Sequence, residues 1–289
     1  MIKSINQSLA HGLELLLTFE NKRPLLTVPE ISELLGFSQG KTYRVIRTLI
    51  KYHLIQENPG TAKYSLGLNA LRLGFVAQQC ITLGAIARPF MSDLSFRTKE
   101  SVLLTALNGT KGICIEAVES KEPVRSSTYQ PGEVIPLHSG ASGKILMAYL
   151  PEEEWNRIIE TEGLGRYTPN TIIGVDRLKK HLREVRKKGY AFSDREVHQD
   201  VRAVGAPILS ATGRLVAGLS VVGPVYRMNK KKCALVAQLV IQCAEKISNH
   251  LELSASTRLN RKKIDESRTI QKSRSLPGRR PGTVRAKVI

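Results

Sequence analysis

The chain has 289 residues, which is room for two domains with a sizeable buried core, and it carries a formal net charge of +19. Residues 255–289 contain 11 basic and 2 acidic residues, so nearly half of this excess lies at the C-terminal end. A positive excess favours a polyanionic partner, with nucleic acid ahead of a membrane. Because no apolar run approaches the ~18 residues that span a bilayer and no signal peptide opens the chain, we expect a cytoplasmic protein.

The first predicted element is a helix from Ser4 to about Glu20. Its apolar residues recur at helical spacing, and we expect the face that they form to pack behind the two helices that follow. This predicted inner face consists of Ile5, Leu9, Leu13, Leu16 and Leu17.

Two short helices follow, each with its own start signal. Thr27 and Glu30 form a capping box, and Gly36 ends this helix where a left-handed residue is favoured. Ser38 caps a second helix whose apolar residues, Val45 among them, recur at helical spacing. An apolar inner face and a basic outer face on this helix predict a helix-turn-helix whose second helix enters the major groove of DNA.

A β-hairpin is predicted directly after these helices, over residues 54–66 with a turn at residues 58–60. Such a wing suits contact with phosphates or with the minor groove. The alternative is a three-helix bundle with a solvated charged face, but the order of caps, basic helix and wing favours DNA binding. We expect DNA contacts from Ser38, Gln39, Lys41, Thr42, Tyr43, Arg44, Arg47 and Lys63, with residues 41–44 facing the DNA.

The predicted secondary structure of the remaining chain changes at about residue 99. Before it, residues 69–98 predict a helical linker, broken near Gly84, that connects two domains rather than forming a third. After it, β-runs and helical patterns mix without a regular βαβ rhythm, which predicts an α+β domain to residue 254. Strands are expected at residues 102–106, 113–118, 124–129, 190–196, 203–209 and 215–222, and helices at 142–150, 151–161, 175–188 and 230–253.

Residues 255–289 have the composition of a disordered segment, rich in Arg, Lys, Ser, Gly and Pro and poor in large apolar residues. Two roles stay open for this tail. It either adds nonspecific affinity for DNA or only keeps the chain in solution.

The segment Pro136–Lys144 invites three catalytic interpretations, and its spacing rejects each of them. A phosphate-binding loop needs Gly where His138 stands and a hydroxyl where Ile145 stands. A Ser-x-x-Lys site needs Ser where Ala141 stands, and a Gly-x-Ser-x-Gly elbow is absent here. What remains is a turn of small residues before a helix, which is either structural or an anion site built from backbone N–H groups.

Other reactive side chains form no catalytic constellation. Asp194 and Glu196 alternate along a predicted strand, where a solvated edge explains both. Ser220 places a hydroxyl in an apolar strand, where it needs a partner or a ligand. The cysteines at positions 80, 114, 233 and 243 lack zinc-ligand or C-x-x-C spacing and are interpreted as reduced, mostly buried thiols. We therefore expect no catalytic residue, no metal site, no cofactor and no enzymatic activity.

Together these motifs resemble the IclR family of bacterial transcriptional regulators over about residues 4–253. The match lies in the helix-turn-helix with its wing, in residues 136–144, and in residues 189–196, 202–207 and 220–224. The resemblance implies a winged helix-turn-helix domain (1–68), a helical linker (69–98), a GAF-like effector-binding domain (99–254) and the extra basic tail (255–289). It also implies double-stranded DNA and a small organic acid as partners, and a homodimer or a dimer of dimers.

In that family a small effector lies between the turn before the Gly-Lys helix and two strands of the sheet. Carried over position by position, the resemblance places the effector site at Ala141, Ser142, Ser193, Ala203, Ser220 and Val222. Members that respond to glyoxylate and pyruvate have an acidic residue at position 193, a thiol at 203 and a hydroxyl at 222. This pocket is therefore expected to be less polar and roomier, and to take an aromatic acid, a sugar acid or another small carboxylate.

The leading interpretation is a ligand-responsive DNA-binding regulator that recognises a two-fold symmetric operator. Two other classes stay open on the sequence. One is an enzyme whose GAF-like domain acts on a small metabolite, against which the missing catalytic pattern argues. The other is a nonspecific architectural DNA binder that depends on the basic tail.

Overall fold

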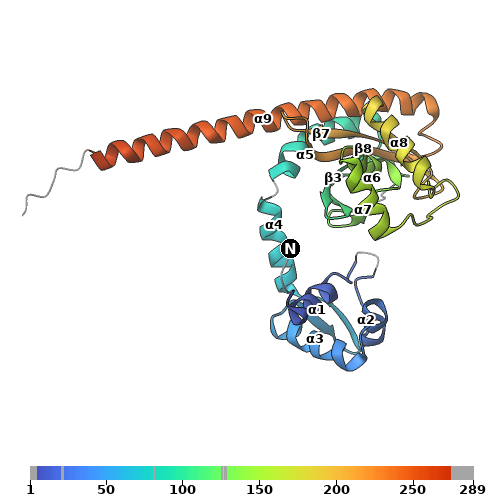
Figure 1. Cartoon of the computed structure of the whole chain (residues 1–289), viewed down its shortest axis with the longest axis vertical. Coiled ribbons are helices and arrows are strands. Elements are labelled where there is room, and N and C mark those ends of the chain that lie inside the picture. The colour runs from blue at the N-terminus through green and yellow to red at the C-terminus, as the bar shows by residue number, and fades with distance from the viewer. Residues whose placement is uncertain (1–4, 21–22, 81, 125, 127–128, 275–289) are drawn as a thin grey trace, which may run out of the picture.

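The chain folds into two parts joined by helix α4 (Leu68–Cys80), as Figure 1 shows. The first part is a small helical domain with a β-hairpin, and the second is an α+β domain, which confirms the predicted fold class. The computed structural model describes residues 5–20, 23–80, 82–124, 126 and 129–274, and it describes the backbone alone for residues 75, 78–80, 82 and 254–274.

The small domain is a winged helix-turn-helix. Its capping box is confirmed, because the Thr27 N–H donates to Glu30 Oε2 at 2.7 Å while the Thr27 hydroxyl accepts from the Glu30 N–H. Gly36 ends the second helix with a φ of 64°, and Ser38 Oγ accepts from the Lys41 N–H to start the third. The elements are α1 (Gln7–Leu16), α2 (Val28–Leu35), α3 (Gln39–Lys51), β1 (Ile55–Asn58) and β2 (Lys63–Leu66). The core contains Leu15, Leu26, Ile31, Ile46, Leu49, Ile55 and Tyr64.

Helix α1 turns a different face toward this core from the predicted one. Its N-cap is Asn6, and Ser4 lies outside the described residues. Leu15 is fully buried, although the predicted inner face did not include it. Four residues of that face are exposed instead, namely Ile5, Leu9, Leu13 and Leu17. The prediction is wrong because α1 carries apolar side chains on two faces, and helical spacing alone does not decide which one packs inward.

The predicted linker divides into two helices with different surroundings. Helix α4 leaves Leu68 and Leu71 exposed. Helix α5 (Thr82–Thr98) begins close to the break expected near Gly84, but it packs against the sheet of the α+β domain through buried Met91 and Leu94. The connection between the two cores is therefore shorter than the predicted 69–98, because the apolar face of α5 belongs to the second core.

One six-stranded sheet forms the centre of the α+β domain, with the strand order β5-β4-β3-β8-β7-β6 and antiparallel neighbours throughout. Leu103 lies opposite Ser220, and Ala203 lies opposite both Ser193 and Val222 on its two neighbouring strands. The strands are β3 (Ser101–Asn108), β4 (Lys111–Val118), β5 (Val134–Ile135), β6 (Ala191–Asp194), β7 (Val201–Leu209) and β8 (Leu215–Pro224). This register gathers four predicted effector residues in one region of the sheet.

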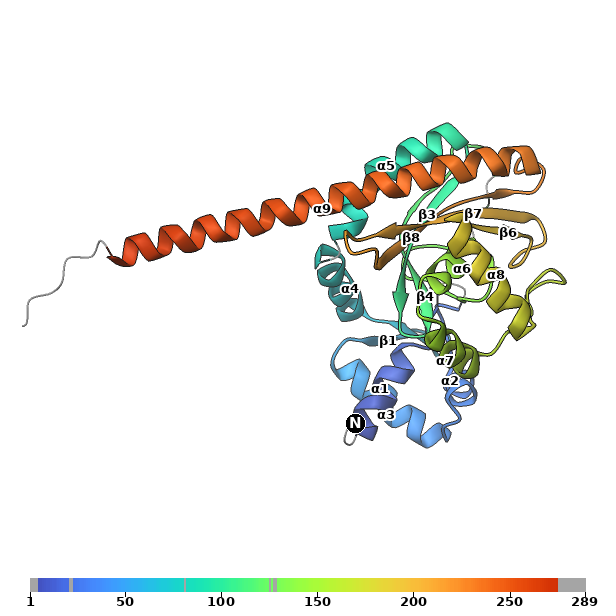
Figure 2. The same cartoon turned by 45° about the horizontal axis from the view of Figure 1, so that its top comes forward.

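Helices cover both faces of this sheet, as Figure 2 shows. Helices α5 and α9 pack on one face and three shorter helices on the other. Because successive strand residues point to opposite faces, Val221 joins the core under α9 while Val222 joins the core under α6. The three shorter helices are α6 (Gly140–Ala148), α7 (Glu152–Glu162) and α8 (Val175–Lys188).

One predicted strand is wrong. Residues 124, 126 and 129 do not lie in a strand, while residues 125, 127 and 128 are outside the described part. The strand that pairs with β4 is instead β5, which follows a turn at Gly132. Val124 is held by a side chain, since Arg227 Nη1 donates to its carbonyl at 2.6 Å. Strand propensity at residues 124–129 did not specify a pairing partner, and pairing decides where a strand forms.

Helix α9 (Lys230–Arg274) continues twenty residues beyond the predicted end of the domain at residue 254. Its first half covers the sheet, and its second half extends away from the rest of the chain in both views (Figures 1 and 2). This corrects the predicted disorder for residues 255–274, while residues 275–289 lie outside the description. Residues 255–276 contain too few large apolar side chains to form a core. They also contain no Gly or Pro, so no residue in this segment stops the helix. Among the described residues, no helix is both long and apolar enough to cross a membrane.

The close packing of α6 on the turn before it generates a stability prediction. A Cβ atom added at Gly143 would lie 2.0 Å from the Pro136 carbonyl oxygen, so Gly143→Ala should lower the free energy of unfolding by about 1–3 kcal/mol. Gly84→Ala in α5 is the matched control, because its Cβ would meet nothing closer than 3.8 Å. Denaturant unfolding of both variants measures the effect, and equal stability of the two would contradict the close contact.

Candidate functional site

Helix α3 presents an exposed polar face away from the core of the small domain. Gln39, Tyr43, Arg44 and Arg47 are exposed on it, and the Arg47 guanidinium lies 5.9 Å from the Tyr43 ring centroid. Ser38 is also exposed at the N-cap. Amide, hydroxyl and guanidinium groups arranged in this way reach base edges and phosphates when a helix lies in the major groove.

Thr42 is not on this face, so its predicted DNA contact is wrong. The side chain is fully buried, and its hydroxyl lies 2.9 Å from Ser32 Oγ and 3.2 Å from the Ser38 carbonyl oxygen. Thr42 precedes buried Ile46 by one helical turn and so shares the inner face with it. A hydroxyl there joins α2 to the start of α3.

Lys41 is turned toward α1. Its Nζ lies 3.0 Å from His11 Nε2 and 3.5 Å from the centroid of the Phe37 ring. Lys63 on the wing lies opposite Asn58 at the start of β2 and is partly exposed, next to the tip of the hairpin. The structure therefore groups four of the predicted contacts on the exposed α3 face, with Ser38 at the start of that helix, whereas Lys63 lies on the wing.

A second candidate site lies at the start of α6, inside the α+β domain. Behind its wall lies Ser220, whose hydroxyl oxygen is 2.7 Å from that of Ser142, and both residues are buried. Five of the six predicted effector residues line one cavity there: Ala141, Ser142, Ser193, Ala203 and Val222. The structure thus brings together residues from β6, β7, β8 and α6 that are distant in the sequence.

The first turn of α6 lines this cavity and contains backbone N–H groups with and without partners. The Gly140 N–H donates to Glu196 Oε2 at 3.3 Å. In the described part of the chain, no group accepts a hydrogen bond from the N–H of Ala141 or of Ser142. A helix start with unpaired N–H groups favours an anion, because the helix dipole places partial positive charge there.

The walls of the cavity are mostly apolar, in line with the expected low polarity. Sequence reasoning missed Leu103, Ile135 and Val197, and it assigned Tyr129 to a strand. Burial raises the pKa of the Tyr129 phenol, which keeps that group neutral. The cavity volume is about 20 Å³, about enough for a single water molecule, so the cavity in this conformation is too small for an organic acid.

A buried ion pair lies next to the start of α6. Lys144 is fully buried, and its Nζ contacts Glu196 Oε1, the Phe192 carbonyl oxygen at 2.7 Å and His181 Nε2 at 3.1 Å. These three acceptors match the three N–H groups of an ammonium. Burial lowers the pKa of Lys144, and the Glu196 carboxylate opposes that shift. Burial and the nearby Lys144 charge lower the pKa of His181 to about 4, so this imidazole is neutral near pH 7.

The described cysteines and acidic residues offer no reactive site. Cys114, Cys233 and Cys243 are free and buried, and burial raises the pKa of Cys114 to about 12 and that of Cys243 to about 11. Such thiols stay protonated and react slowly. The side chain of Cys80 lies outside the described part. Within the residues that the structure describes, no group of three His, Cys, Asp or Glu side chains is placed to hold a metal ion.

A winged helix-turn-helix joined to a separate α+β domain with a small cavity defines a DNA-binding transcriptional regulator with an effector-binding domain. The family model of the IclR helix-turn-helix domain matches residues 8–59, and that of the bacterial transcriptional regulator IclR C-terminal domain matches residues 77–249. The chain belongs to the IclR family.

Relatives of known identity match over most of their length. The HTH-type transcriptional regulator XynR of Escherichia coli is 30% identical over 248 residues, which cover 86% of this chain and 98% of XynR. The transcriptional repressor IclR of the same species is 26% identical, with 84% and 89% covered. Both matches leave about a seventh of this chain unaligned.

Solved structures share the fold. An IclR transcriptional regulator from Alicyclobacillus acidocaldarius superposes with a TM-score of 0.73 at 27% identity, covering 85% of this chain and 99% of that one. An IclR homologue from Microbacterium hydrocarbonoxydans, crystallised with 4-hydroxybenzoate, has a TM-score of 0.70 at 22% identity, with 84% and 98% covered. The second likeness concerns the fold alone.

The burial of Thr42 generates a prediction that separates it from the DNA face. Thr42→Val should lower the free energy of unfolding by about 1–3 kcal/mol, because it removes a buried hydroxyl and leaves Ser32 Oγ without that partner. Thr48→Val is the control, since the Thr48 hydroxyl donates to the Arg44 carbonyl on the exposed side of the same helix. Thermal unfolding of both variants tests this. A stable Thr42→Val protein with weakened DNA binding would show instead that Thr42 contacts DNA.

Proposed function

We propose that this regulator binds a two-fold symmetric operator as a dimer and responds to a small organic acid held at the start of α6. The observation that supports the acid most directly is the pair of α6 N–H groups at Ala141 and Ser142, two residues that line the cavity and whose N–H groups have no acceptor among the described residues. The effector is bound and released unchanged in this proposal, so no residue has a catalytic role.

Apolar surface on two helices supports the dimer. Leu9 and Leu13 of α1 and Leu68 and Leu71 of α4 are each more than half exposed. Clusters of exposed apolar side chains mark interaction sites, because leaving them in water is costly. One α3 helix covers only a few base pairs, so two copies related by a two-fold axis give the recognition that one lacks.

The chemistry of the cavity supports the effector class. The unpaired N–H groups and the hydroxyls of Ser142 and Ser220 favour a carboxylate, whereas Leu103, Tyr129 and Val222 favour an apolar or aromatic body. A small acid with such a body meets both demands. Because the cavity volume is about 20 Å³, the acid binds only when the walls move apart, and it therefore stabilises a different conformation from the closed one.

Arg44→Ala is expected to weaken operator binding by about 1–3 kcal/mol and to relax preference at one base pair, because it removes an exposed guanidinium from α3. Genomic fragments enriched by the purified protein supply the operator, and fluorescence anisotropy measures the affinity. Arg183→Ala on α8 removes an exposed guanidinium from the other domain and should leave the affinity unchanged. If Arg44→Ala kept both the wild-type affinity for the operator and the wild-type sequence preference, Arg44 would not be a base-contacting residue.

Leu13→Glu is expected to shift the protein toward monomers, with dimer affinity falling about tenfold or more, because a carboxylate would be buried in an apolar interface. Sedimentation velocity over a concentration series measures the shift. Ile173→Glu is the control, since Ile173 is exposed in the α+β domain. A Leu13→Glu protein that dimerises like the wild type would place the interface elsewhere, and a wild-type monomer that binds one half-site at full affinity would overturn the dimer.

Ser220→Ala is expected to weaken effector binding by about 1–2 kcal/mol while leaving operator affinity without effector nearly unchanged. Calorimetry with small acids suggested by the genes beside the operator measures this. Ser210→Ala, which removes an exposed hydroxyl outside the cavity, is the control. Ser142→Phe should fill the cavity and abolish the response, so unchanged affinity in both Ser220→Ala and Ser142→Phe would place the ligand elsewhere.

A further inference from the structure

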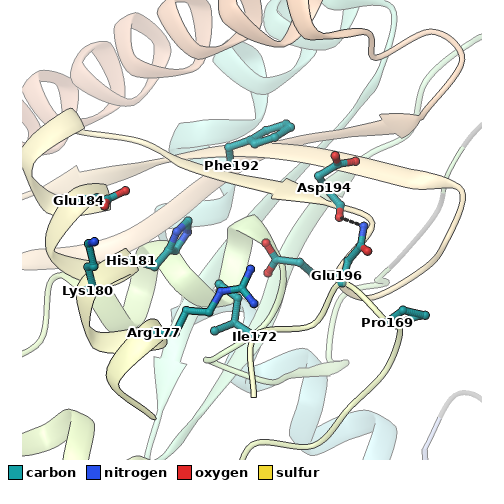
Figure 3. A pocket seen from close by; sticks show the side chains of 10 residues that line it. Pro169, Ile172, Arg177, Lys180, His181, Glu184, Phe192, Asp194 and Glu196 are labelled. Carbon is teal, nitrogen blue, oxygen red and sulfur yellow. Dashed lines mark hydrogen bonds between the residues drawn. The ribbon is translucent and has the colours of Figure 1, made fainter. Parts of the chain in front are cut away.

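A second, larger pocket lies on the other side of the buried ion pair from the effector cavity. It has a volume of about 510 Å³ and opens between helix α8 and the edge strand β6 (Figure 3). Glu196 belongs to its lining, and the same carboxylate accepts from the Gly140 N–H at the start of α6. No described residue lines both pockets, but Glu196 connects them, because it lines this pocket and bonds Gly140, which lines the cavity at the start of α6.

The carboxylates around this pocket already have cationic partners. Asp194 Oδ1 lies 2.8 Å from Arg202 Nε, and Glu184 Oε2 lies 3.8 Å from Lys188 Nζ. Glu196 is paired with buried Lys144. The negative charge of the lining is thus compensated from outside the pocket or from behind it.

Two cations of the lining have no such partner. Arg177 and Lys180 on α8 form no ion pair with any described residue. Figure 3 shows Arg177 reaching from α8 toward Glu196 and Lys180 beside His181 on the same helix. The three residues follow each other at i, i+3 and i+4, so their side chains share one face of α8. With the three lining carboxylates already paired, Arg177 and Lys180 are the lining charges that have no counter-charge among the described residues.

His181 adds a neutral donor whose orientation is set by Lys144. Its Nε2 lies 3.1 Å from the Lys144 ammonium, which has no lone pair and can only donate. Nε2 is therefore the acceptor, and the single proton of the neutral imidazole lies on Nδ1. Nδ1 has no partner among the described residues, and His181 lines the pocket. The pocket thus contains an imidazole N–H beside two unpaired cations.

We propose that this pocket is a second ligand site, which binds a small oxyanion, a carboxylate or a phosphate, through Arg177, Lys180 and the Nδ1–H of His181. The guanidinium and ammonium supply charge-assisted hydrogen bonds, and the imidazole supplies a neutral one. The site is separate from the cavity at the start of α6 and does not depend on the identity of the effector there.

Calorimetric titration of the full chain with inorganic phosphate, and separately with succinate, tests the proposal at constant ionic strength in chloride. The pocket variant is Arg177→Gln with Lys180→Gln. The matched control is Arg183→Gln with Lys187→Gln, which makes the same charge change on α8 outside the pocket lining. We expect the wild type and the control to bind with equal affinity and the pocket variant to bind about tenfold more weakly or worse.

Binding of phosphate alone or of succinate alone, lost in the pocket variant, would support the site and identify its ligand chemistry. Equal affinity in all three proteins would show that the anion binds elsewhere, for example on the α3 face, and would overturn the proposal. Absence of binding to the wild type beyond that of chloride would overturn it as well. All four substituted residues have exposed side chains, so folding of the variants is not in question.

Discussion

The buried ion pair between Lys144 and Glu196 is the interaction on which the arrangement of the α+β domain depends most. Glu196 accepts from the Gly140 N–H at the start of α6, and Lys144 donates to the Phe192 carbonyl oxygen on edge strand β6. Charges in such a place are stable only as a pair, and removing one partner typically costs about 3–5 kcal/mol. The turn before α6 and the loop after β6 are therefore positioned together, and both shape the cavity at the start of α6.

The helices of the DNA-binding domain were predictable, because the signals that start and end them are local in the sequence. The capping box at Thr27 and Glu30, the glycine at position 36 and the cap at Ser38 each act within one helical turn, and all formed as predicted. The convergence of Ser142, Ser193 and Val222 on one cavity was predictable only from the family resemblance, since no spacing in the sequence relates α6 to β6 and β8.

What the sequence did not predict depends on tertiary packing. Thr42 and Tyr43 are neighbours with similar polarity, yet one is buried under α2 and the other exposed, because a helical step of one residue changes the face. Tyr129 reaches the cavity from a segment without regular structure, and nothing near it in the sequence marks it as a lining residue. The role of Lys144 was hidden for the same reason, since its partners Glu196 and His181 lie 52 and 37 residues away.

Helix α9 extends as a long arm beyond the effector-binding domain. Its first half is fixed on the sheet, so the nucleation that an isolated helix of this length would have to supply is already provided, and the extension beyond residue 254 only propagates it. Twenty further residues at the helical rise make an arm of about 30 Å, so tilting α9 by about 10° would move its tip by about 5 Å. Small changes in the packing under α9 are thereby enlarged at a distance from the domain, in a part of the chain that the IclR family models do not cover.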